Sequence, residues 1–425
     1  MILYWSSIIL ALASIVSCGY LICATVLTDR FSRKASSGQR ASRPGVTILK
    51  PLHGAEPGLL ENLASFCTQN YRGPVQIVLG VQDLRDDAIA VVEQLRAEHG
   101  THQTDLVIDA TMHGLNRKVS NLVNMLRRVE HDIIVVADSD IRVDPDYLSR
   151  VVAALEERGI GAVTCLYHGL AAPGVWARLA ELGINAHFLP SVIVGLALGL
   201  AHPCFGSTIA FKRKALAEIG GFIGIADCLA DDYAIGARLR ARGHKITVLP
   251  VTVGHVCGEM SARELWQHEV RWARTVRAID PVGYTGLIVT HAFPFALITA
   301  LASISAQSLG LAIAIGLSII SFGCRLALLR QVERAFGLPV QSYWLLPLRD
   351  LLSFAVFLSS VVGRNVKWKG CGYQLGSRDC PGVPGGHHTQ SRPNREAVLL
   401  EIGSGRLRGG RLMSFGQWGH RRARP

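Results

Sequence analysis

The stretch HDIIVVADSDIRVDPDYL, which runs from His131 to Leu148, decides the predicted fold. Its first part, residues 133–137, is an unbroken apolar run with the length and composition of a buried parallel strand. Asp138 then emerges at the carboxyl end of that strand, and Asp140 follows two residues later. Side chains two positions apart in an extended chain face the same way, so we expect the two carboxylates to converge.

The convergence of Asp138 and Asp140 has a chemical and a structural interpretation. Two close carboxylates repel each other unless a cation lies between them, and Mg²⁺ or Mn²⁺ takes such oxygen ligands together with substrate phosphates. A D-x-D at a strand end therefore fits a metal that bridges a nucleotide diphosphate. The structural alternative is that either aspartate only caps a turn. Asp144 and Asp146 are assigned to the start of the next helix, which is expected from about Pro145 to Arg158.

Around this stretch, from Val46 to about Gly283, short β-branched runs alternate with longer amphipathic stretches. Strands are predicted for VTILKPL, VQIVLGVQD and TDLVIDA, and helices for GLLENLASFCTQ, DAIAVVEQLRAEHG and NRKVSNLVNMLRRV. This alternation predicts an open, mostly parallel α/β sheet with helices on both faces. Ligands of such sheets bind at the carboxyl ends of the strands.

Apolar segments flank the sheet region on both sides. Residues 3–25 are apolar for long enough to cross a bilayer, and the basic residues after them predict that the next domain is cytoplasmic. Residues 286–303 and 309–329 are expected to form a transmembrane hairpin. A third apolar piece, residues 344–362, contains an arginine and an aspartate and is followed by basic residues. We expect this piece to be re-entrant or interfacial.

Two other segments lack the features of an ordinary domain core. LPSVIVGLALGLAHP, residues 189–203, is apolar all round but too short to span a bilayer comfortably. A buried core helix and a helix that dips into the bilayer surface are both open interpretations of it. The stretch 376–425 is rich in Gly, Arg and Pro without periodicity, which predicts a disordered basic tail.

The composition agrees with a membrane protein. The chain has 425 residues, of which 49% are hydrophobic and only 18% are charged. Its net charge of +12 comes largely from arginines beside apolar segments and near the C-terminus, not from a basic face with interleaved aromatics. That pattern disfavours a nucleic-acid partner. The 10 cysteines form no C-x-x-C pair and no zinc-type spacing, as expected for a reducing cytosol.

Two pieces of the predicted sheet domain carry candidate ligands for a nucleotide sugar. Asp83 in GVQD follows an apolar run, where it would reach a nucleobase or ribose; a turn residue is the alternative. In HGLNRKVSNL, Gly114 permits an unusual backbone path, Asn116 can cap a helix, and Lys118 can meet a phosphate as a point charge. An ordinary helix N-terminus is the alternative for this second piece.

Two later helices carry candidates for acid–base chemistry and for binding the diphosphate. Asp231 and Asp232 form either an acidic helix start or the place of a general base that deprotonates an acceptor hydroxyl. In ELWQHEVRWARTVRA, His268, Arg271 and Trp272 share one helix face. Arg271 would neutralise a leaving diphosphate, and Trp272 would form an apolar wall against a sugar or a lipid chain. A solvated amphipathic helix before a membrane span is the alternative.

Taken in order, GVQD, G-L-N-R-K, DSDIRV, DDY and H-x-x-R-W resemble the motif set of the ceramide glucosyltransferase family, whose members are inverting, membrane-bound GT-A glycosyltransferases. VVGRNVKWKGCGYQL also looks like that family's closing W-[RK]-x-x-x-Y element. The resemblance covers roughly residues 1–375. The parts that it implies, together with the tail, are a transmembrane helix (1–27), a cytosolic Rossmann-like GT-A domain (28–285), a transmembrane hairpin (286–330), a re-entrant or interfacial helix with the closing motif (344–375) and the tail (376–425).

The same resemblance implies a role for each matching residue. The ligands of the nucleotide sugar would be Asp83, Gly114, Asn116, Lys118 and Asp138. The divalent metal, Mg²⁺ or Mn²⁺, would be held by Asp138 and Asp140. The catalytic base would be Asp232. The residues over the diphosphate and the acceptor would be His268, Arg271 and Trp272.

Within the family the chain most resembles the bacterial hopanoid-associated branch, which transfers N-acetylglucosamine from UDP-GlcNAc to bacteriohopanetetrol. Two departures favour that branch, because Asp140 stands where ceramide enzymes usually have glycine and His268 stands where they usually have Gln or Arg. The expected protein is a multi-pass inner-membrane enzyme with a cytoplasmic catalytic domain, a UDP-sugar donor and a hopanoid acceptor. The alternatives are glucose transfer from UDP-glucose to ceramide, a processive polysaccharide synthase, and a non-catalytic membrane scaffold.

Overall fold

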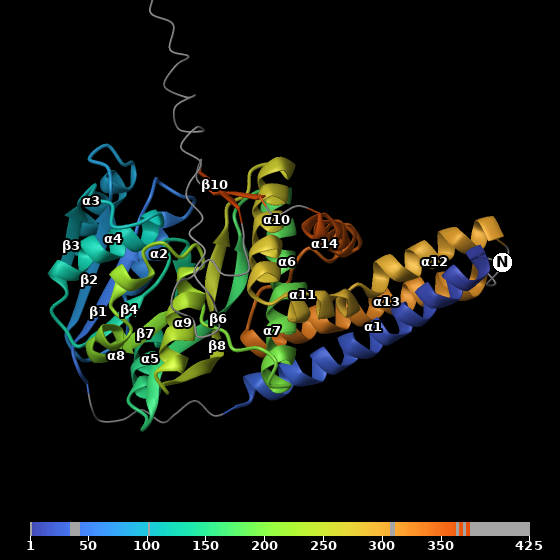
Figure 1. Ribbon diagram of the computed structural model, residues 1–425, viewed down its shortest axis with the longest axis horizontal. Helices are drawn as coiled ribbons and strands as arrows, with labels where there is room; N and C mark the ends of the chain where they lie inside the picture. The colour runs from blue at the N-terminus through green and yellow to red at the C-terminus, as the bar shows by residue number, and fades with distance from the viewer. Residues whose placement is uncertain are drawn as a thin grey trace, which may run out of the picture. The chain divides into compact units, whose positions relative to one another are not determined.

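The computed structural model describes residues 2–34, 43–100, 103–306, 311–362, 365–368 and 371–374 (Figure 1). The predicted tail, residues 376–425, lies outside the described residues. The strands are β1 (Val46–Pro51), β2 (Val75–Val81), β3 (Gln103–Ile108), β4 (Ile133–Val136), β5 (Ile141–Arg142), β6 (Ile160–Ala171), β7 (Ile209–Lys212), β8 (Lys245–Cys257), β9 (Asn365–Trp368) and β10 (Cys371–Gln374).

Helices precede, separate and follow these strands. The α-helices are α1 (Ile2–Ser32), α2 (Leu59–Cys67), α3 (Ala88–Glu98), α4 (Arg117–Met125), α5 (Tyr147–Leu155), α6 (Val175–Gly183), α7 (Leu189–Ala197), α8 (Arg213–Glu218), α9 (Asp231–Ala241), α10 (Ala262–Ile279), α11 (Pro281–Gly286), α12 (Ala292–Ala306), α13 (Leu311–Phe336) and α14 (Leu346–Val361). The short helical segments are η1 (Leu126–Arg128), η2 (Ile184–Phe188), η3 (Phe222–Ile225), η4 (Leu287–Thr290) and η5 (Tyr343–Leu345), of which η2 is a π-helix.

The described part of the chain contains an eight-stranded sheet in the order β3-β2-β1-β4-β7-β6-β8-β5. β1 pairs in parallel with both β2 and β4, and β6 pairs in parallel with β8. β7 runs antiparallel to β4 and β6, and β5 runs antiparallel to β8. The predicted mostly parallel α/β sheet is therefore confirmed, with β7 and β5 as the reversed strands.

Both faces of the sheet are covered, because successive side chains of β1 enter different cores. Val46 and Ile48 pack in a cluster with residues of α2, α3 and α5. Leu49 packs in a second cluster with residues of α4 and α9. Helices therefore leave only the strand ends accessible, and the carboxyl ends of β1, β2 and β4 meet at one edge.

The predicted helix from about Pro145 to Arg158 is shorter than expected. α5 begins at Tyr147, and the side chain of Asp146 before it caps no backbone amide of the helix but pairs with Arg150 in α5. Residues Ile141 and Arg142 instead form β5, which pairs with β8. A turn closed by the bond from the Tyr147 amide to the Asp144 carbonyl lies between β5 and α5, so the helix starts later than the local sequence indicates.

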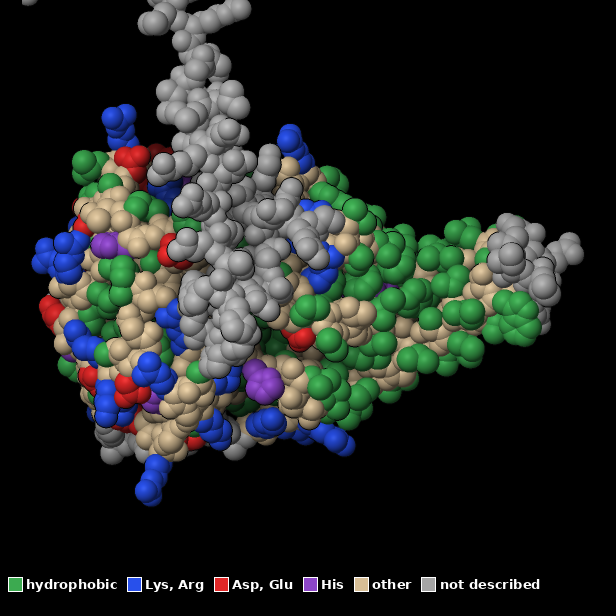
Figure 2. All heavy atoms as spheres, viewed as in Figure 1, with side chains coloured by type: hydrophobic (Ala, Val, Ile, Leu, Met, Phe, Trp, Pro, Cys, Tyr) green, Lys and Arg blue, Asp and Glu red, His purple; other side chains and the backbone are tan. Residues whose placement is uncertain are grey.

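Apolar helices occur where the sequence predicts membrane spans. Among the described residues, four helices are long and apolar enough to cross a membrane, or up to five if the pair 281–290 and 292–304, bent by 59°, is counted as one span. These helices support the prediction that the chain is a membrane protein. Figure 2 shows hydrophobic side chains covering the surface over α1, α12 and α13, whereas charged side chains gather over the sheet domain.

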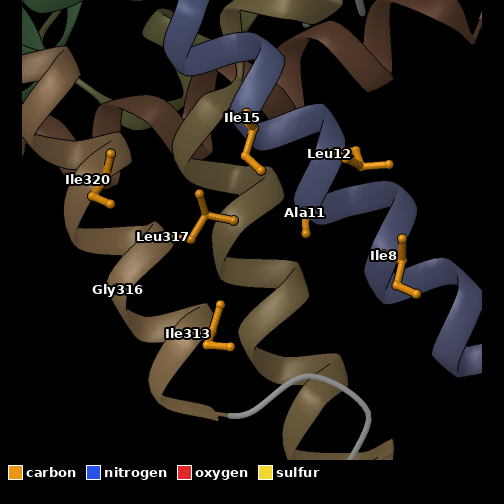
Figure 3. A pocket seen from close by; sticks show the side chains of 8 residues that line it. All are labelled: Ile8, Ala11, Leu12, Ile15, Ile313, Gly316, Leu317 and Ile320. Atoms are coloured by element: carbon orange, nitrogen blue, oxygen red, sulfur yellow. The ribbon is translucent and has the colours of Figure 1, made fainter.

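The packing of the first helix against the later ones uses small polar groups as well as apolar side chains. Ser14 donates to the carbonyl of Ala292 over 3.0 Å and lies 3.0 Å from the Ser321 hydroxyl. A groove of about 500 Å³ lies between α1 and α13 and is lined only by apolar side chains and glycine (Figure 3). Such a surface is suited to hydrocarbon rather than water.

The apolar stretch 189–203 forms α7 and then leaves the helical conformation. α7 continues from α6 through η2, and residues 175–197 together are long and apolar enough to be one of the candidate spans. Leu189 and Ile193 pack with Leu21 of α1 in one buried cluster. The segment thus packs against the predicted anchor helix, which fits either of the two interpretations given above.

Buried ion pairs hold α13 and α14 to the rest of the fold. Arg325 of α13 lies 3.0 Å from Asp350 of α14 and also donates to the carbonyls of Ala186 in η2 and Thr290 in η4. Arg349 of α14 makes a two-point contact with Glu269 of α10. The polar residues of the third apolar piece are therefore paired inside the protein, as buried charges must be. Its length alone also permits a full span.

Candidate active site

The carboxyl edge of the sheet carries a bridge of alternating charges. Lys118, in the first turn of α4, lies 2.6 Å from Oδ1 of Asp138 and 3.0 Å from Oδ2 of Asp231 at the start of α9. Burial alone would lower the pKa of Lys118, but Asp138, Asp231 and Asp232 raise it well above its usual range. Lys118 is thus a permanent cation that joins two elements more than a hundred residues apart in the chain.

A glycine makes room for this bridge. Gly206 precedes β7, and a Cβ at that position would lie 2.7 Å from Oδ2 of Asp138 and 3.1 Å from Nζ of Lys118. The Gly206 carbonyl accepts from the Asp138 amide, and the Gly206 amide donates to Oδ2 of Asp232 over 3.2 Å. Gly206 therefore sets the distance between the carboxylates on either side of it.

Asp232 is the carboxylate best suited to exchange a proton. Its Oδ1 accepts from the amide of Tyr233 over 2.7 Å, and Oδ2 accepts from Gly206. Burial and the adjacent charge of Asp231 nevertheless raise the pKa of Asp232 to about 6. A carboxylate with such a pKa is ionised at neutral pH and is a stronger base than an exposed aspartate.

Asp138 and Asp140 differ in their surroundings although both side chains are 34% exposed. Burial, against the attraction of Lys118, raises the pKa of Asp138, and the charge of Asp140 adds to the rise. His255 of β8 lies 3.4 Å from Oδ2 of Asp140. His255, followed by Lys50, outweighs the effect of burial and lowers the pKa of Asp140. Asp140 is therefore the more firmly ionised of the two.

Lys50 in β1 lies beneath this pair and was not anticipated from the sequence. Its side chain is 0% exposed, and Nζ donates to the carbonyl of Asp138 over 2.8 Å and lies 3.8 Å from the ring centroid of Phe66. Burial lowers the pKa of Lys50 to about 7, although Asp140 and Asp138 oppose that shift. The lysine ties the D-x-D segment to the central strand of the parallel half-sheet.

The residues before α4 act mainly on the backbone. Asn116 is 2% exposed, and its side chain accepts from the Val119 amide and donates to the Cys228 carbonyl over 2.8 Å. Gly114 lies so close to Ala226 that a Cβ would approach its carbonyl oxygen to 2.5 Å. Both residues therefore hold the segment before α9 next to α4, which brings Asp231 and Lys118 together.

Asp83 stands apart from this group. It follows β2 at the same edge of the sheet, its side chain accepts from the Arg85 amide over 2.9 Å, and the residue is exposed. Its position leaves the remaining carboxylate oxygen accessible to a ligand that extends along the edge from Asp138.

Helix α10 brings a second group to the other side of Asp140. His268 lies 2.6 Å from Glu259, and its ring meets Trp272 edge-on with centroids 4.5 Å apart. Trp272 in turn lies 6.0 Å from the ring of His255, which faces Asp140. Burial lowers the pKa of Arg271, and its guanidinium has no ion-pair partner among the residues described here. An unpaired, half-buried cation of this kind is suited to an anionic ligand.

The residues that sequence reasoning missed are joined to the site by long-range contacts. Lys50 is the most visible of them, because it is the one charged residue in the strand VTILKP. His255 and Gly206 carry no such signal. Their roles depend on the pairing of β8 with β5 and on the approach of the segment before β7 to β4.

The chain matches the family described as glycosyl transferase family 21 over residues 9–379. It belongs to that family. Ceramide glucosyltransferase 1 from Caenorhabditis elegans is 27% identical over 206 residues, which are 48% of this chain and 44% of that protein. Ceramide glucosyltransferase 3 from the same organism is 24% identical over 360 residues, which are 83% of this chain and 78% of that protein. The chain thus spans less than half of the first relative and most of the second.

One solved structure shares the fold of this family 21 chain. The mannosyltransferase PcManGT from Pyrobaculum calidifontis, in complex with GDP-Man and Mn²⁺, has a TM-score of 0.52 and 20% sequence identity. The match covers 85% of this chain and 99% of that chain. This likeness confirms the expected GT-A fold, and the family match confirms the expected glycosyltransferase class.

The donor atoms at the sheet edge fit a hard divalent ion. Asp138 and Asp140 offer carboxylate oxygens, and Oδ1 of Asp140 is buried without a hydrogen-bond partner in the described part of the chain. Within the same residues no group of three or more His, Cys, Asp or Glu side chains is arranged to hold a metal by itself. An ion bound through one or two carboxylates takes its other ligands from substrate phosphates and water.

Proposed function

We propose that this family 21 protein is a membrane-bound inverting glycosyltransferase that moves a sugar from a UDP-sugar to a hydroxyl of a membrane lipid. The observation that carries the proposal is the position of Asp232, a carboxylate with a raised pKa, beside the Asp138–Lys118–Asp231 bridge. Direct displacement of the nucleotide by the acceptor hydroxyl requires a base for the hydroxyl and a charged site for the nucleotide, and both are proposed at this edge of the sheet.

The reaction follows from these positions. Asp232 takes the proton of the acceptor hydroxyl while the oxygen of that hydroxyl attacks the anomeric carbon of the sugar. The new glycosidic C–O bond forms as the bond between that carbon and the diphosphate oxygen breaks, so UDP leaves with both electrons and the configuration inverts. Arg271 and Lys118 would neutralise the growing charge of the leaving group. Asp83 contacts the uridine part.

Asp138 and Asp140 would hold the divalent ion, Mg²⁺ or Mn²⁺. When bound, that ion supplies charge neutralisation for the diphosphate. The firmly ionised Asp140 and the Lys50 bond to the Asp138 carbonyl keep the two carboxylates in place before the donor arrives. A preformed arrangement of this kind lowers the cost of binding a charged donor.

The acceptor is proposed to enter from the bilayer, with the catalytic domain in the cytoplasm of a cell whose inner membrane carries the helices. The candidate spans support this orientation, as do Arg30 in the last turn of α1 and Arg33 and Lys34 directly after it. α14 would lie at the membrane interface, because its paired charges join it to α10 of the catalytic domain.

The substrates proposed first are UDP-GlcNAc and bacteriohopanetetrol, with UDP-glucose and ceramide as the second pair. Asp140 and His268, which depart from the usual pattern of ceramide enzymes, favour the first pair. Purified full-length protein in lipid vesicles would be given each UDP-sugar with each acceptor. We expect a hexosamine on bacteriohopanetetrol. A glucosylated ceramide without any hexosaminyl hopanoid would overturn this choice, and the absence of UDP-sugar binding would favour a scaffold.

The rate of transfer is expected to depend on pH through Asp232. The base must be ionised, and the pKa of Asp232 is raised to about 6 by burial and by Asp231. Activity should therefore be lost as the pH falls through about 6 and should reach a plateau above it. The profile of kcat/KM from about pH 4.5 to about pH 8.5 measures this dependence. A profile without a rising limb near pH 6 would contradict the role of Asp232.

A further inference from the structure

An aromatic cluster lies next to the proposed catalytic centre, on β6, η2, β8, α10 and the segment before β7. We define it as Tyr167, Phe188, Phe205, His255 and Trp272. The ring of Tyr167 is stacked on Phe188 with centroids 4.7 Å apart and lies 5.5 Å from His255, 5.8 Å from Phe205 and 6.4 Å from Trp272. Tyr167 is thus the member that contacts all the others.

The sheet order places this cluster away from the nucleotide. Asp83 follows β2 and Asp138 follows β4, whereas Tyr167 lies on β6, on the far side of β7 from β4. The ring of Tyr167 contacts His255, which pairs with Asp140, and it contacts Phe205, whose neighbour Gly206 donates to Asp232. The hydroxyl of Tyr167 stays protonated, because burial, followed by the charges of Asp232 and Asp140, raises its pKa well above the usual range. Among the described residues that hydroxyl has no hydrogen-bond partner. A protonated phenol without a partner beside the base can bond to an incoming oxygen.

The other end of the aromatic cluster continues into the membrane helices. Phe188 ends η2 and is followed directly by α7, which packs on α1. Phe188 and Phe205 contact both the main core of the sheet domain and the buried cluster of α1, α7 and α13. Apolar packing therefore extends from the candidate spans through Phe188 and Phe205 to Tyr167.

We propose that Tyr167 is an acceptor-binding residue whose ring packs on the hydrocarbon next to the reacting hydroxyl and whose phenol hydrogen-bonds to an oxygen of the acceptor. This inference rests on the proposed transfer to a lipid. The ligand class is an alcohol at the end of a membrane lipid. Asp232 and Tyr167 then contact the same end of the acceptor, one as base and the other as an orienting group.

The kinetic test uses Tyr167→Phe and Tyr167→Ala in the full chain in lipid vesicles, with bacteriohopanetetrol and UDP-GlcNAc. Loss of one hydrogen bond should raise the acceptor KM about fivefold in Tyr167→Phe, and loss of the ring should raise it about 50-fold in Tyr167→Ala. The KM for UDP-GlcNAc should change by much less than the KM for the acceptor. Tyr71→Phe is the matched control, because its hydroxyl bonds to Pro44 far from the carboxylates.

A binding test separates this inference from the proposed function. A long-chain alcohol that carries a photoactivatable diazirine is added without any donor, and the labelled peptides are mapped. We expect label in residues 160–171 and 184–197, reduced in Tyr167→Ala and kept in Tyr71→Phe. This labelling would support the acceptor site even if the protein transfers its sugar to another lipid or to none. Label elsewhere, or equal changes in acceptor and donor KM, would overturn the role of Tyr167.

Discussion

Asp232→Asn is expected to abolish glycosyl transfer, with kcat lowered by about 10³-fold or more, while UDP-sugar binding is retained. The amide keeps the size of the side chain, and its one oxygen can still accept a hydrogen bond from one of the two backbone amides, of Gly206 or of Tyr233, that bind Asp232. It cannot take a proton from the acceptor. Since Lys118 pairs with Asp138 and Asp231 rather than with Asp232, the nucleotide site should survive the change.

The measurement pairs a transfer assay with calorimetric titration of UDP-sugar. Asp87→Asn is the matched control, because Asp87 is exposed before α3 and makes no capping bond with its side chain. Transfer at the unchanged rate in Asp232→Asn would refute its role as base. Loss of UDP-sugar binding together with transfer would instead show that Asp232 serves the donor.

Asp138→Asn is expected to cost the protein its metal-dependent affinity for the UDP-sugar, by about 100-fold. The substitution removes one of two proposed metal ligands and leaves Lys118 with Asp231 alone. The positive charge of Lys118 would then be balanced by only one carboxylate at the proposed diphosphate site. Asp140 keeps its contact with His255 and would hold a metal less tightly by itself.

The measurement is a titration of UDP-sugar at increasing Mn²⁺ and Mg²⁺, and again after a chelator has removed the ions. Asp144→Asn is the matched control, since Asp144 is an exposed aspartate six residues further along the same segment. Affinity in Asp138→Asn that rises with metal as it does in the unaltered protein would rule out Asp138 as a ligand. Affinity that is independent of metal in both proteins would rule out the metal itself.

Local sequence was sufficient for the parallel half of the fold and for the position of the D-x-D. The apolar run at 133–137 forms β4 over Ile133–Val136, and its carboxyl end meets those of β1 and β2. A strand of this composition has few alternatives once helices alternate with it. The carboxylates at its end were therefore predictable as a group, although their individual roles stay predictions.

The rest of the site depends on contacts between distant segments. Lys50 reaches the Asp138 carbonyl across 88 positions of the chain, and Asn116 reaches Cys228 across 112. Tyr167 lies in a strand whose sequence shows only that the strand is buried. The rings that contact Tyr167 come from four other parts of the chain. Periodicity reports which face of an element is apolar, but not which element will cover that face.

The contacts of Arg325 have a consequence for how the protein is made. Arg325 reaches Ala186 across 139 positions and Thr290 across 35, and its carboxylate partner Asp350 comes later still. A chain emerging from the ribosome contains η2 and η4 before α13 and α14 have been synthesised. The carbonyls of Ala186 and Thr290 therefore cannot bind Arg325 until α13 is present. The segment that carries Phe188 can reach its final form only after the last helices have been inserted. The contacts that form last are thus those next to Phe188, on the proposed acceptor side of the site.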